Sequence, residues 1–174
     1  MNSNFNPLSP EELVLRINKI PRIRLAQLPT ALEYAPNISK ELNINLYIKR
    51  DDCTALAFGG NKTRHLEFIM AKTLSGEYDC ILTGAASQSN FCRQAVAAAN
   101  KLNLDSYLVL MHGVKGKLMQ GNFLLYNILG ANVDVVDGEN LENIPKHLDK
   151  KYDELIKEGR KPLLIYGGFG EEDT

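Results

Sequence analysis

A lysine that closely follows two glycines has a setting suited to chemistry. The segment Phe58-Gly59-Gly60-Asn61-Lys62-Thr63-Arg64 places Lys62 at the start of an expected helix. A positive charge in the first turn of a helix is unfavourable by ~0.3–1 kcal/mol because it opposes the helix dipole. Lys62 is therefore either a solvated residue or a lysine with a function. The functional role would be a Schiff base, in which the lysine amine condenses with an aldehyde.

A turn of small and polar residues is the second feature that could do chemistry. Thr83-Gly84-Ala85-Ala86-Ser87-Gln88-Ser89-Asn90 follows an apolar, strand-like segment and precedes an alanine-rich helical one. Small residues let the backbone approach a ligand, and the free N–H groups at a helix start can bind a carboxylate or a phosphate. The alternative is that Ser87 or Ser89 only caps the helix.

Other common cofactor motifs are missing. No G-x-G-x-x-G follows the first strand of the expected sheet and no Walker lysine motif occurs, which argues against classical dinucleotide and P-loop sites. No metal site is predicted, because the three histidines are far apart in unlike contexts. They are His65, His112 and His147. The cysteines form no C-x-x-C pair and are interpreted as small buried hydrophobic residues in a reducing compartment. They are Cys53, Cys80 and Cys92.

The elements that must position these residues alternate between helix and strand. Helices are expected at about 61–74, 89–102, 118–129 and within 139–158. Strands are expected at 79–83, 106–111, 132–136 and 163–166. Alternation with short connections predicts an α/β fold, a parallel sheet with helices on both faces. Ligands of such sheets bind at the carboxyl ends of the strands.

The sequence before this region is less regular. Ser9-Pro10-Glu11-Glu12 combines a serine cap, a proline at the first helical position and a capping-box glutamate. Leu13, Ile17 and Ile20 are expected to form the buried stripe of that helix. The segment that follows is interrupted by Pro21, Pro29 and Pro36. In it we expect a short helix near 39–42 and a strand at 46–49. This part has the pattern of an incomplete domain.

Composition limits the class of protein. The 174 residues are 44% hydrophobic and 24% charged, which is typical of a globular protein with one domain, or with one domain and part of a second. Twenty Lys+Arg against twenty-one Asp+Glu give a net charge of −1, so neither a nucleic-acid nor a membrane partner is expected. Apolar segments are far shorter than the roughly 20 residues of a membrane helix. With no signal-peptide pattern at the N-terminus, we expect a cytoplasmic protein.

Several segments, in this order, resemble the pyridoxal-phosphate enzymes of the tryptophan-synthase-β fold. Within that fold they resemble the D-cysteine desulfhydrase and 1-aminocyclopropane-1-carboxylate deaminase group. Ala31 and His65 depart from the group, which more often has proline and lysine there. The similar segments are Pro29-Thr30-Ala31-Leu32-Glu33, Ile48-Lys49-Arg50-Asp51-Asp52 with Phe58 to Arg64, Thr83-Gly84-Ala85 with Gln88-Ser89-Asn90 and Arg93, Gly121-Asn122 with Leu124-Leu125, and Gly130-Ala131.

The resemblance implies a role for each matching residue. Lys62 would form the Schiff base with pyridoxal 5'-phosphate and move the substrate proton. Asn90 would hydrogen-bond the ring oxygen of the cofactor and contact the substrate. Ser87, Gln88 and Ser89 would hold the substrate carboxylate at the helix start, and Ser89 would also take part in proton transfer. The substrate would be a small amino acid.

The implied activity is that of a lyase or deaminase. Of the substrates we favour D-cysteine, which would be converted to pyruvate, sulfide and ammonia. The alternatives are a 1-aminocyclopropane-1-carboxylate deaminase, or a non-catalytic α/β binding or interaction module that no longer turns over substrate.

The resemblance accounts for only the N-terminal half of the family's chains. Residues 1–62 would be an incomplete N-terminal part of the large domain, 63–166 the small α/β domain, and 167–174 a divergent truncated tail. Apolar faces before Lys62 would then lack the part that normally covers them, so we expect a poorly anchored N-terminal segment. The expected partner is a second copy of the chain or a separately encoded C-terminal half.

Overall fold

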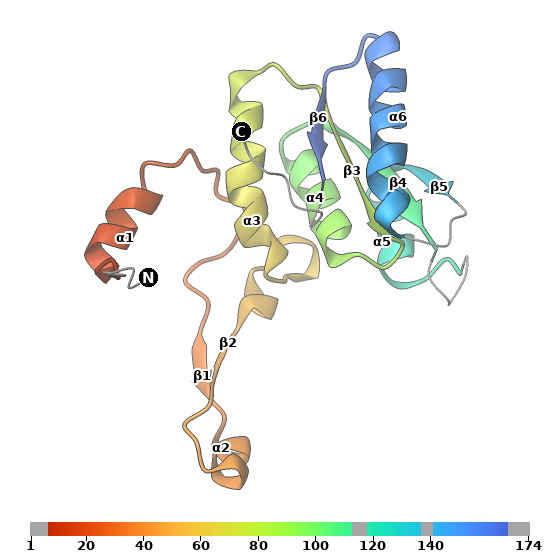
Figure 1. The fold of residues 1–174 in the computed structure, drawn as a ribbon. Helices are drawn as coiled ribbons and strands as arrows, with labels where there is room; N and C mark the ends of the chain where they lie inside the picture. Colours follow the sequence, from red (N-terminus) through yellow and green to blue (C-terminus); the bar gives the residue numbers. More distant parts are fainter. Residues whose placement is uncertain (1–6, 113–117, 137–140, 167–174) are drawn as a thin grey trace, which may run out of the picture.

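The computed structural model describes residues 7–112, 118–136 and 141–166 (Figure 1). The divergent tail expected at 167–174 lies outside the described residues. The helices are α1 (Pro10–Ile17), α2 (Pro36–Leu42), α3 (Lys62–Ile69), α4 (Asn90–Lys101), α5 (Gly121–Ile128) and α6 (Ile144–Lys157). The strands are β1 (Leu32–Tyr34), β2 (Tyr47–Lys49), β3 (Cys80–Ala86), β4 (Asp105–Met111), β5 (Asn132–Val136) and β6 (Pro162–Ile165).

A four-stranded sheet with the order β5-β4-β3-β6 forms the centre of the molecule, and each neighbouring pair is parallel. Thr83 of β3 lies opposite Leu108 of β4 and Ile165 of β6. Parallel neighbours need crossover connections, which the helices supply. The predicted α/β fold, with helices on both faces of a parallel sheet, is therefore confirmed.

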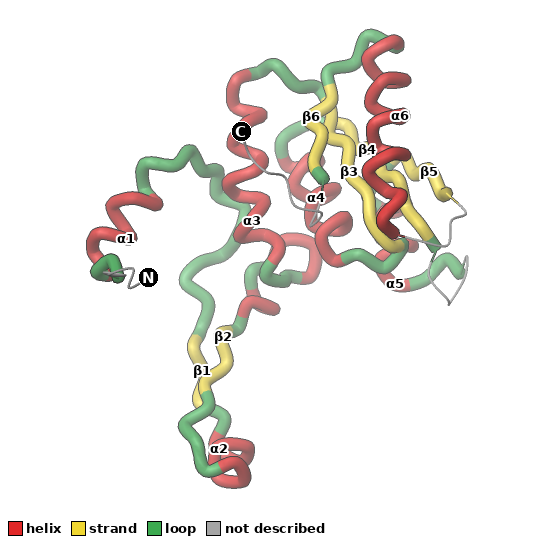
Figure 2. Tube along the Cα trace, in the orientation of Figure 1, coloured by secondary structure: helices red, strands yellow, loops and turns green. Residues whose placement is uncertain are grey.

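The alternation of side chains along the strands assigns the helices to the two faces. Ile81 packs against α3 and α4, whereas Leu82, the next residue, packs against α6. In β4, Leu108 packs against α5 and Val109 against α6. Helices α3, α4 and α5 thus cover one face and α6 covers the other (Figure 2).

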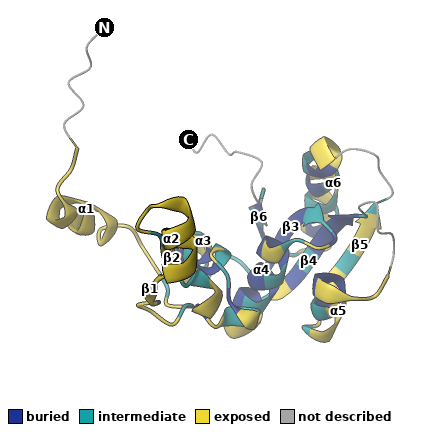
Figure 3. Cartoon of the chain, turned by 90° about the horizontal axis from the view of Figure 1, so that it is seen from below, coloured by how far each residue is buried: buried dark blue, intermediate teal, exposed yellow. Residues whose placement is uncertain are grey.

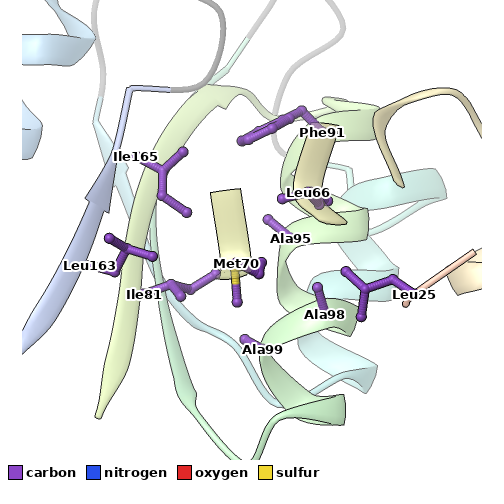
Figure 4. Close-up of a cluster of buried hydrophobic side chains, with 10 residues drawn as sticks. All are labelled: Leu25, Leu66, Met70, Ile81, Phe91, Ala95, Ala98, Ala99, Leu163 and Ile165. Carbon is purple, nitrogen blue, oxygen red and sulfur yellow. The ribbon is translucent and has the colours of Figure 1, made fainter. Parts of the chain in front are cut away.

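The core between α3, α4 and the sheet is formed by ten buried residues (Figure 4). Leu66 and Met70 come from α3 and the turn after it, and both are completely buried. Leu25 belongs to the cluster although it precedes the sheet by more than fifty residues. The other members are Ile81, Phe91, Ala95, Ala98, Ala99, Leu163 and Ile165.

One strand extends further than expected. The sequence predicts a strand at 79–83, but β3 continues to Ala86. Gly84, Ala85 and Ala86 continue the parallel pairing with β4, up to Met111. Tertiary pairing has extended a strand through residues of low intrinsic β-propensity. The polar turn therefore begins at Ser87, directly at the carboxyl edge of the sheet.

The first helix confirms one expectation and corrects another. Ser9 and Glu12 form the predicted capping box, with Pro10 in the first turn. The predicted stripe is not buried: Leu13 and Ile17 of α1 are exposed, as Figure 3 shows for the helix, and so is Ile20, which lies beyond its end. The helix extends from the body, and within the described residues nothing covers its apolar side.

A second exposed part is an arm made of β1, β2 and α2, which projects from the α/β body (Figure 1). The two strands pair antiparallel, with Glu33 opposite Ile48, and every residue of both strands is exposed. Ser39 is the buried residue of α2, and its hydroxyl accepts a hydrogen bond from the Leu46 N–H at 2.9 Å. Local hydrogen bonds, rather than an apolar core, hold this arm.

Between these exposed parts, residues 22–26 are hydrogen-bonded to a side chain of α3. The Glu67 carboxylate is completely buried and accepts hydrogen bonds from the N–H groups of Leu25 and Ala26, both at 2.9 Å. Arg22 adds an Nε donor at 2.7 Å. The expected weak anchoring of the N-terminal segment is thus not uniform along the chain.

Limited proteolysis should follow this uneven anchoring. We expect trypsin to cut after Lys19 and Lys40 first, because both are exposed and lie outside the core. Cleavage after Arg24 should be about tenfold slower, because it requires local opening of the Leu25 and Glu67 contacts. Mass spectrometry of a digestion time course measures the order. Cleavage after Arg24 at the same rate as after Lys40 would contradict this prediction.

Candidate active site

The carboxyl edge of the sheet brings together the two segments singled out by the sequence. The turn from Ser87 connects β3 to α4, and the loop before Lys62 lies against the first turns of α4 through hydrogen bonds to Arg93 and Gln94. Contacts across 34 and 35 positions of the sequence thereby join the two segments into one candidate site.

The loop before Lys62 has an unusual backbone. Ala55, Ala57 and Phe58 have φ angles of 73°, 46° and 68°, which is strained for residues other than glycine. Gly59 follows with a φ of 73°, and a Cβ there would lie 1.8 Å from the Asp52 carbonyl oxygen. Strained backbone clusters at functional sites because the surroundings must hold it in place.

Polar contacts within the loop hold this conformation. The N–H of Gly60 donates to the carbonyl of Asp51 and to the hydroxyl of Thr54, both at 2.9 Å. The hydroxyl of Thr54 also donates to the Gly60 carbonyl at 2.9 Å. Arg64 donates to the Asp51 carboxylate from Nε and Nη2, at 2.8 and 2.7 Å. The hydrogen bonds from Arg64 lower the pKa of the Asp51 carboxylate.

Helix α4 fixes the same loop from the other side. The Gly59 carbonyl accepts hydrogen bonds from Arg93 Nη2 at 2.9 Å and from Gln94 Nε2 at 2.6 Å. The completely buried Gln94 side chain also accepts from the Thr63 hydroxyl at 2.7 Å. Residues on both sides of Lys62 are therefore bonded to α4.

Lys62 is the first residue of α3, as the sequence predicts, and it is half-buried. The helix has no side-chain cap at Asn61. Within the part of the chain that the structure describes, the Lys62 amine has no hydrogen-bond or ion-pair partner. A half-buried lysine whose amine no carboxylate neutralises is suited to bond an aldehyde.

The turn at the start of α4 shows both features that the sequence suggests. Ser89 caps the helix, since its hydroxyl accepts from the Cys92 N–H at 3.2 Å. Among the described residues, the N–H groups of Gln88, Asn90 and Phe91 have no acceptor. Ser87 is buried, and its N–H donates to the Met111 carbonyl at 2.9 Å. The cap therefore leaves N–H groups that can still donate hydrogen bonds to an anion.

The Gln88 side chain has both ends engaged. Its Oε1 accepts from the Asn122 N–H at 2.9 Å, and its Nε2 donates to the Gln120 carbonyl at 3.1 Å. A Cβ on Gly121 would lie 2.6 Å from Gln88 Oε1, so any other residue there would displace this end of the Gln88 side chain. In this arrangement Gln88 can offer a ligand its backbone N–H, whereas its side chain links the turn to α5.

Asn90 is oriented by its neighbours. Its Oδ1 accepts from Arg93 Nη1 at 3.1 Å and from Asn122 Nδ2 at 3.0 Å. Because two donors point at this atom, it must be the amide oxygen, and the other end of the side chain is the nitrogen Nδ2. The Asn90 Nδ2 has no acceptor among the described residues and is the end available to a ligand oxygen.

Two residues of this network have no assigned role in the sequence analysis. Asn122 donates through Nδ2 to the Gln88 carbonyl at 2.8 Å, and its Oδ1 accepts from Arg93 Nη1, also at 2.8 Å. Both Arg93 and Asn122 lie within the motifs that resemble the family. Their linking function could not be predicted, because it depends on α4 and α5 lying side by side.

Two of the three cysteines fit the sequence interpretation. Cys80 and Cys92 are buried, and burial raises the pKa of each thiol to about 12. Such thiols are poor nucleophiles. Cys53 is exposed, which corrects the prediction for this residue. It lies in a short 3-10 turn, Asp51–Cys53, at the surface, so no core surrounds it.

A cavity of about 580 Å³ lies elsewhere, between the N-terminal segment and α3. Its lining includes Arg22, Arg24, Lys49, Arg64 and Glu67, but neither Lys62 nor any residue of the turn 87–90. Within the described ranges, no three His, Cys, Asp or Glu side chains gather as a metal site would require. No described helix is both long and apolar enough to cross a bilayer.

Comparison with known proteins identifies the family. The family model described as "Pyridoxal-phosphate dependent enzyme" matches residues 23–172. The chain belongs to this family. A pyridoxal-phosphate enzyme needs a lysine amine for the cofactor aldehyde and a donor for its ring oxygen. The unpaired amine of Lys62 and the oriented Nδ2 of Asn90 fit these needs.

Individual relatives of this pyridoxal-phosphate chain agree with the predicted group. The putative 1-aminocyclopropane-1-carboxylate deaminase of Pyrococcus horikoshii is 41% identical over 151 residues, covering 86% of the chain and 45% of the relative. The D-cysteine desulfhydrase of Klebsiella pneumoniae (strain 342) is 38% identical over 153 residues, covering 86% and 46%. The chain spans about half the length of these relatives.

A solved structure confirms the fold. The crystal structure of an ACC deaminase homologue superposes with a TM-score of 0.84 at 39% sequence identity. The match covers 92% of this chain and 48% of that one. The predicted family, fold and cofactor class are thus supported by sequence and by structure.

Proposed function

We propose that this chain carries the lysine-bearing half of a pyridoxal-phosphate-dependent lyase that acts on small amino acids. The observation that carries the proposal is the unpaired amine of the half-buried Lys62, next to a loop that hydrogen bonds connect to α4, the helix whose start has free N–H donors. The membership of the chain in the family supplies the cofactor class.

Each site residue would have a role that its chemical groups allow. When bound, pyridoxal phosphate supplies an electron sink for the substrate α-carbon. Lys62 would hold the cofactor aldehyde through Nζ and would move the substrate proton. Asn90 would donate from Nδ2 to the ring oxygen of the cofactor and contact the substrate. Lys62 would thus have two roles, to hold the cofactor and to move a proton at Nζ.

The turn before α4 would bind the substrate carboxylate. The backbone N–H groups of Gln88 and Asn90 would donate to it, aided by the positive end of the helix. Ser87 and Ser89 would add hydroxyl donors. Ser89 can do so while capping the helix, since its oxygen accepts from Cys92 and its hydrogen stays available. Its proton-transfer role stays a prediction.

We favour D-cysteine as the substrate, and the cyclopropane amino acid is the other candidate. Relatives bearing both names match this chain at similar identity, 38% and 41%. The carboxylate that residues 87–90 would bind is common to both substrates. Selection between them therefore depends on groups beyond this turn. The cytoplasmic location stays a prediction.

We propose that the exposed apolar surface of the N-terminal part binds the portion of the family fold that this sequence does not span. The relatives are about twice as long, and the N-terminal part exposes apolar side chains that a protein interior normally covers. Among them are Leu15, Ile20, Leu32, Leu42, Tyr47 and Phe58. A second copy of the chain is the alternative occupant of this surface. Phe58, 79% exposed, lies in the loop before Lys62, so this surface borders the site.

The experiment that tests the function is covalent trapping. The purified chain is incubated with pyridoxal phosphate, its visible spectrum is recorded, and borohydride reduction fixes the adduct for peptide mapping. We expect one adduct per chain at Lys62, lost in Lys62→Ala and retained in Lys72→Ala, which removes an exposed lysine of the following turn. Scattered labelling of surface lysines, unchanged in Lys62→Ala, would contradict the proposal and support the non-catalytic module.

A further inference from the structure

Arg93 connects three segments of the candidate site with one side chain. Its Nη1 donates to Asn90 Oδ1 at 3.1 Å and to Asn122 Oδ1 at 2.8 Å, and its Nη2 donates to the Gly59 carbonyl at 2.9 Å. Within the described residues, no carboxylate forms an ion pair with it. The half-buried Arg93 thus directs Nη1 and Nη2 to neutral acceptors of the site, whereas its buried Nε has no hydrogen-bond partner among the described residues.

The geometry points to Arg93 as a positioning residue that holds the Lys62 loop and the Asn90 amide in one fixed arrangement. This inference rests on the proposed function, because it assigns that arrangement to the binding of the cofactor. Through Gly59, Arg93 sets the loop that ends at Lys62. Through Asn90 Oδ1, it turns the amide so that Nδ2 is the free end.

Arginine is suited to this role in a way that lysine is not. A guanidinium presents five N–H donors in a planar fork, so Nη1 and Nη2 reach acceptors on different segments at once. An ammonium group has the same charge but only one nitrogen, and it cannot donate along both directions of the fork. Arg93→Lys therefore keeps the charge and removes the link.

The loop has a second support, which makes the role testable. Gln94 Nε2 also donates to the Gly59 carbonyl, at 2.6 Å, and Gln94 is completely buried. Loss of Arg93 should leave this contact and the fold in place. The expected effect is therefore on the precision of the loop and of Asn90 rather than on folding.

Arg160→Lys is the matched control. Arg160 is also half-buried and bridges separate groups, namely Asp79 at 3.1 Å, Asp105 at 2.6 Å and the Tyr107 hydroxyl at 3.1 Å. These groups lie near the amino ends of β3 and β4, at the opposite edge of the sheet from the site. The control removes an arginine link of similar complexity that has no contact with Lys62.

The first readout needs no cofactor. Amide hydrogen exchange of the full chain should become about tenfold faster at residues 59–63 in Arg93→Lys, which corresponds to one lost charge-assisted hydrogen bond. Arg160→Lys should leave exchange there unchanged. Unchanged exchange at 59–63 in Arg93→Lys would overturn the inference, whatever the outcome with the cofactor.

The second readout is the trapping at Lys62. Arg93→Lys should lower the adduct yield at limiting pyridoxal phosphate about tenfold and shift the visible absorption maximum, because Asn90 no longer presents its donor in a fixed position. Arg160→Lys should change neither. Faster exchange at 59–63 together with wild-type trapping and spectrum would overturn the positioning role. Absence of a Lys62 adduct in the wild-type chain would instead refute the proposed function, and the exchange result would separate the two failures.

Discussion

Replacing Gly59 by alanine should destabilise the chain by about 4 kcal/mol, through backbone strain and the loss of several hydrogen bonds. A Cβ at this position would lie 1.8 Å from the Asp52 carbonyl oxygen, and that atom is backbone. The loop must move, which separates the Gly59 carbonyl from Arg93 and Gln94. The adduct at Lys62 should fall with it, to less than about a tenth of the wild-type yield.

Gly76→Ala is the control for Gly59→Ala. Gly76 has almost the same φ, 74° against 73°, but nothing lies within 4 Å of a Cβ built on it. Its substitution should cost only about 1 kcal/mol of left-handed strain. Urea unfolding of both variants and of the wild type measures the difference. Equal unfolding free energies for the two variants would show that the contact with Asp52 does not constrain the loop.

Replacing Glu67 by alanine should lower the free energy of unfolding by about 3 kcal/mol, because it leaves buried N–H groups without an acceptor. This is the second large effect that we expect. The Leu25 and Ala26 N–H groups both donate to Glu67 Oε1 at 2.9 Å, and Arg22 pairs with the other oxygen. Glu77→Ala, at an exposed glutamate, should change the free energy of unfolding by less than about 0.5 kcal/mol. Urea unfolding at pH 7 compares the two variants.

Because Glu67 is a buried carboxylate, the stability of the fold should depend on pH. Burial alone would raise the pKa of Glu67, but the hydrogen bonds from Ala26, Leu25 and Arg22 outweigh burial and lower the pKa below its ordinary value of 4.5. A group with a lowered pKa stabilises the fold at pH values above its unfolded pKa, and loses this contribution as the pH falls through the folded value.

Glu67→Gln should abolish this part of the acid sensitivity. The wild type should lose stability below a pH of about 4.5 more steeply than the variant, since the amide cannot take up a proton in this range. The measurement is urea unfolding from pH 7 down to pH 3. Parallel profiles of wild type and Glu67→Gln would mean that the carboxylate does not contribute through its charge.

Local patterns were enough to predict most of the elements. The strand at Asn132–Val136 and the capping box at Ser9 were predicted correctly because each depends on neighbouring residues. The alternation of helices and strands predicts the parallel sheet, since short crossovers leave few other arrangements. The resemblance of ordered motifs predicted the family that the comparisons confirm. The roles of Lys62 and residues 87–90 stay predictions.

Features that depend on segments meeting in space could not be predicted from local patterns. The amphipathic pattern of α1 predicts burial, but a pattern does not supply the surface that would cover it. The continuation of β3 to Ala86 required β4 beside it. The burial of Glu67 required the chain at residues 22–26 to return to α3.

The sequence by itself determined most of the elements, the parallel sheet, the family and the position of Lys62 at the start of α3. Only the tertiary structure decided how that lysine is held, because Arg93 and Gln94 reach the Gly59 carbonyl across 34 and 35 positions of the sequence. Side-chain hydrogen bonds depend on distances of a few tenths of an ångström, and helix packing rather than local propensity sets such distances.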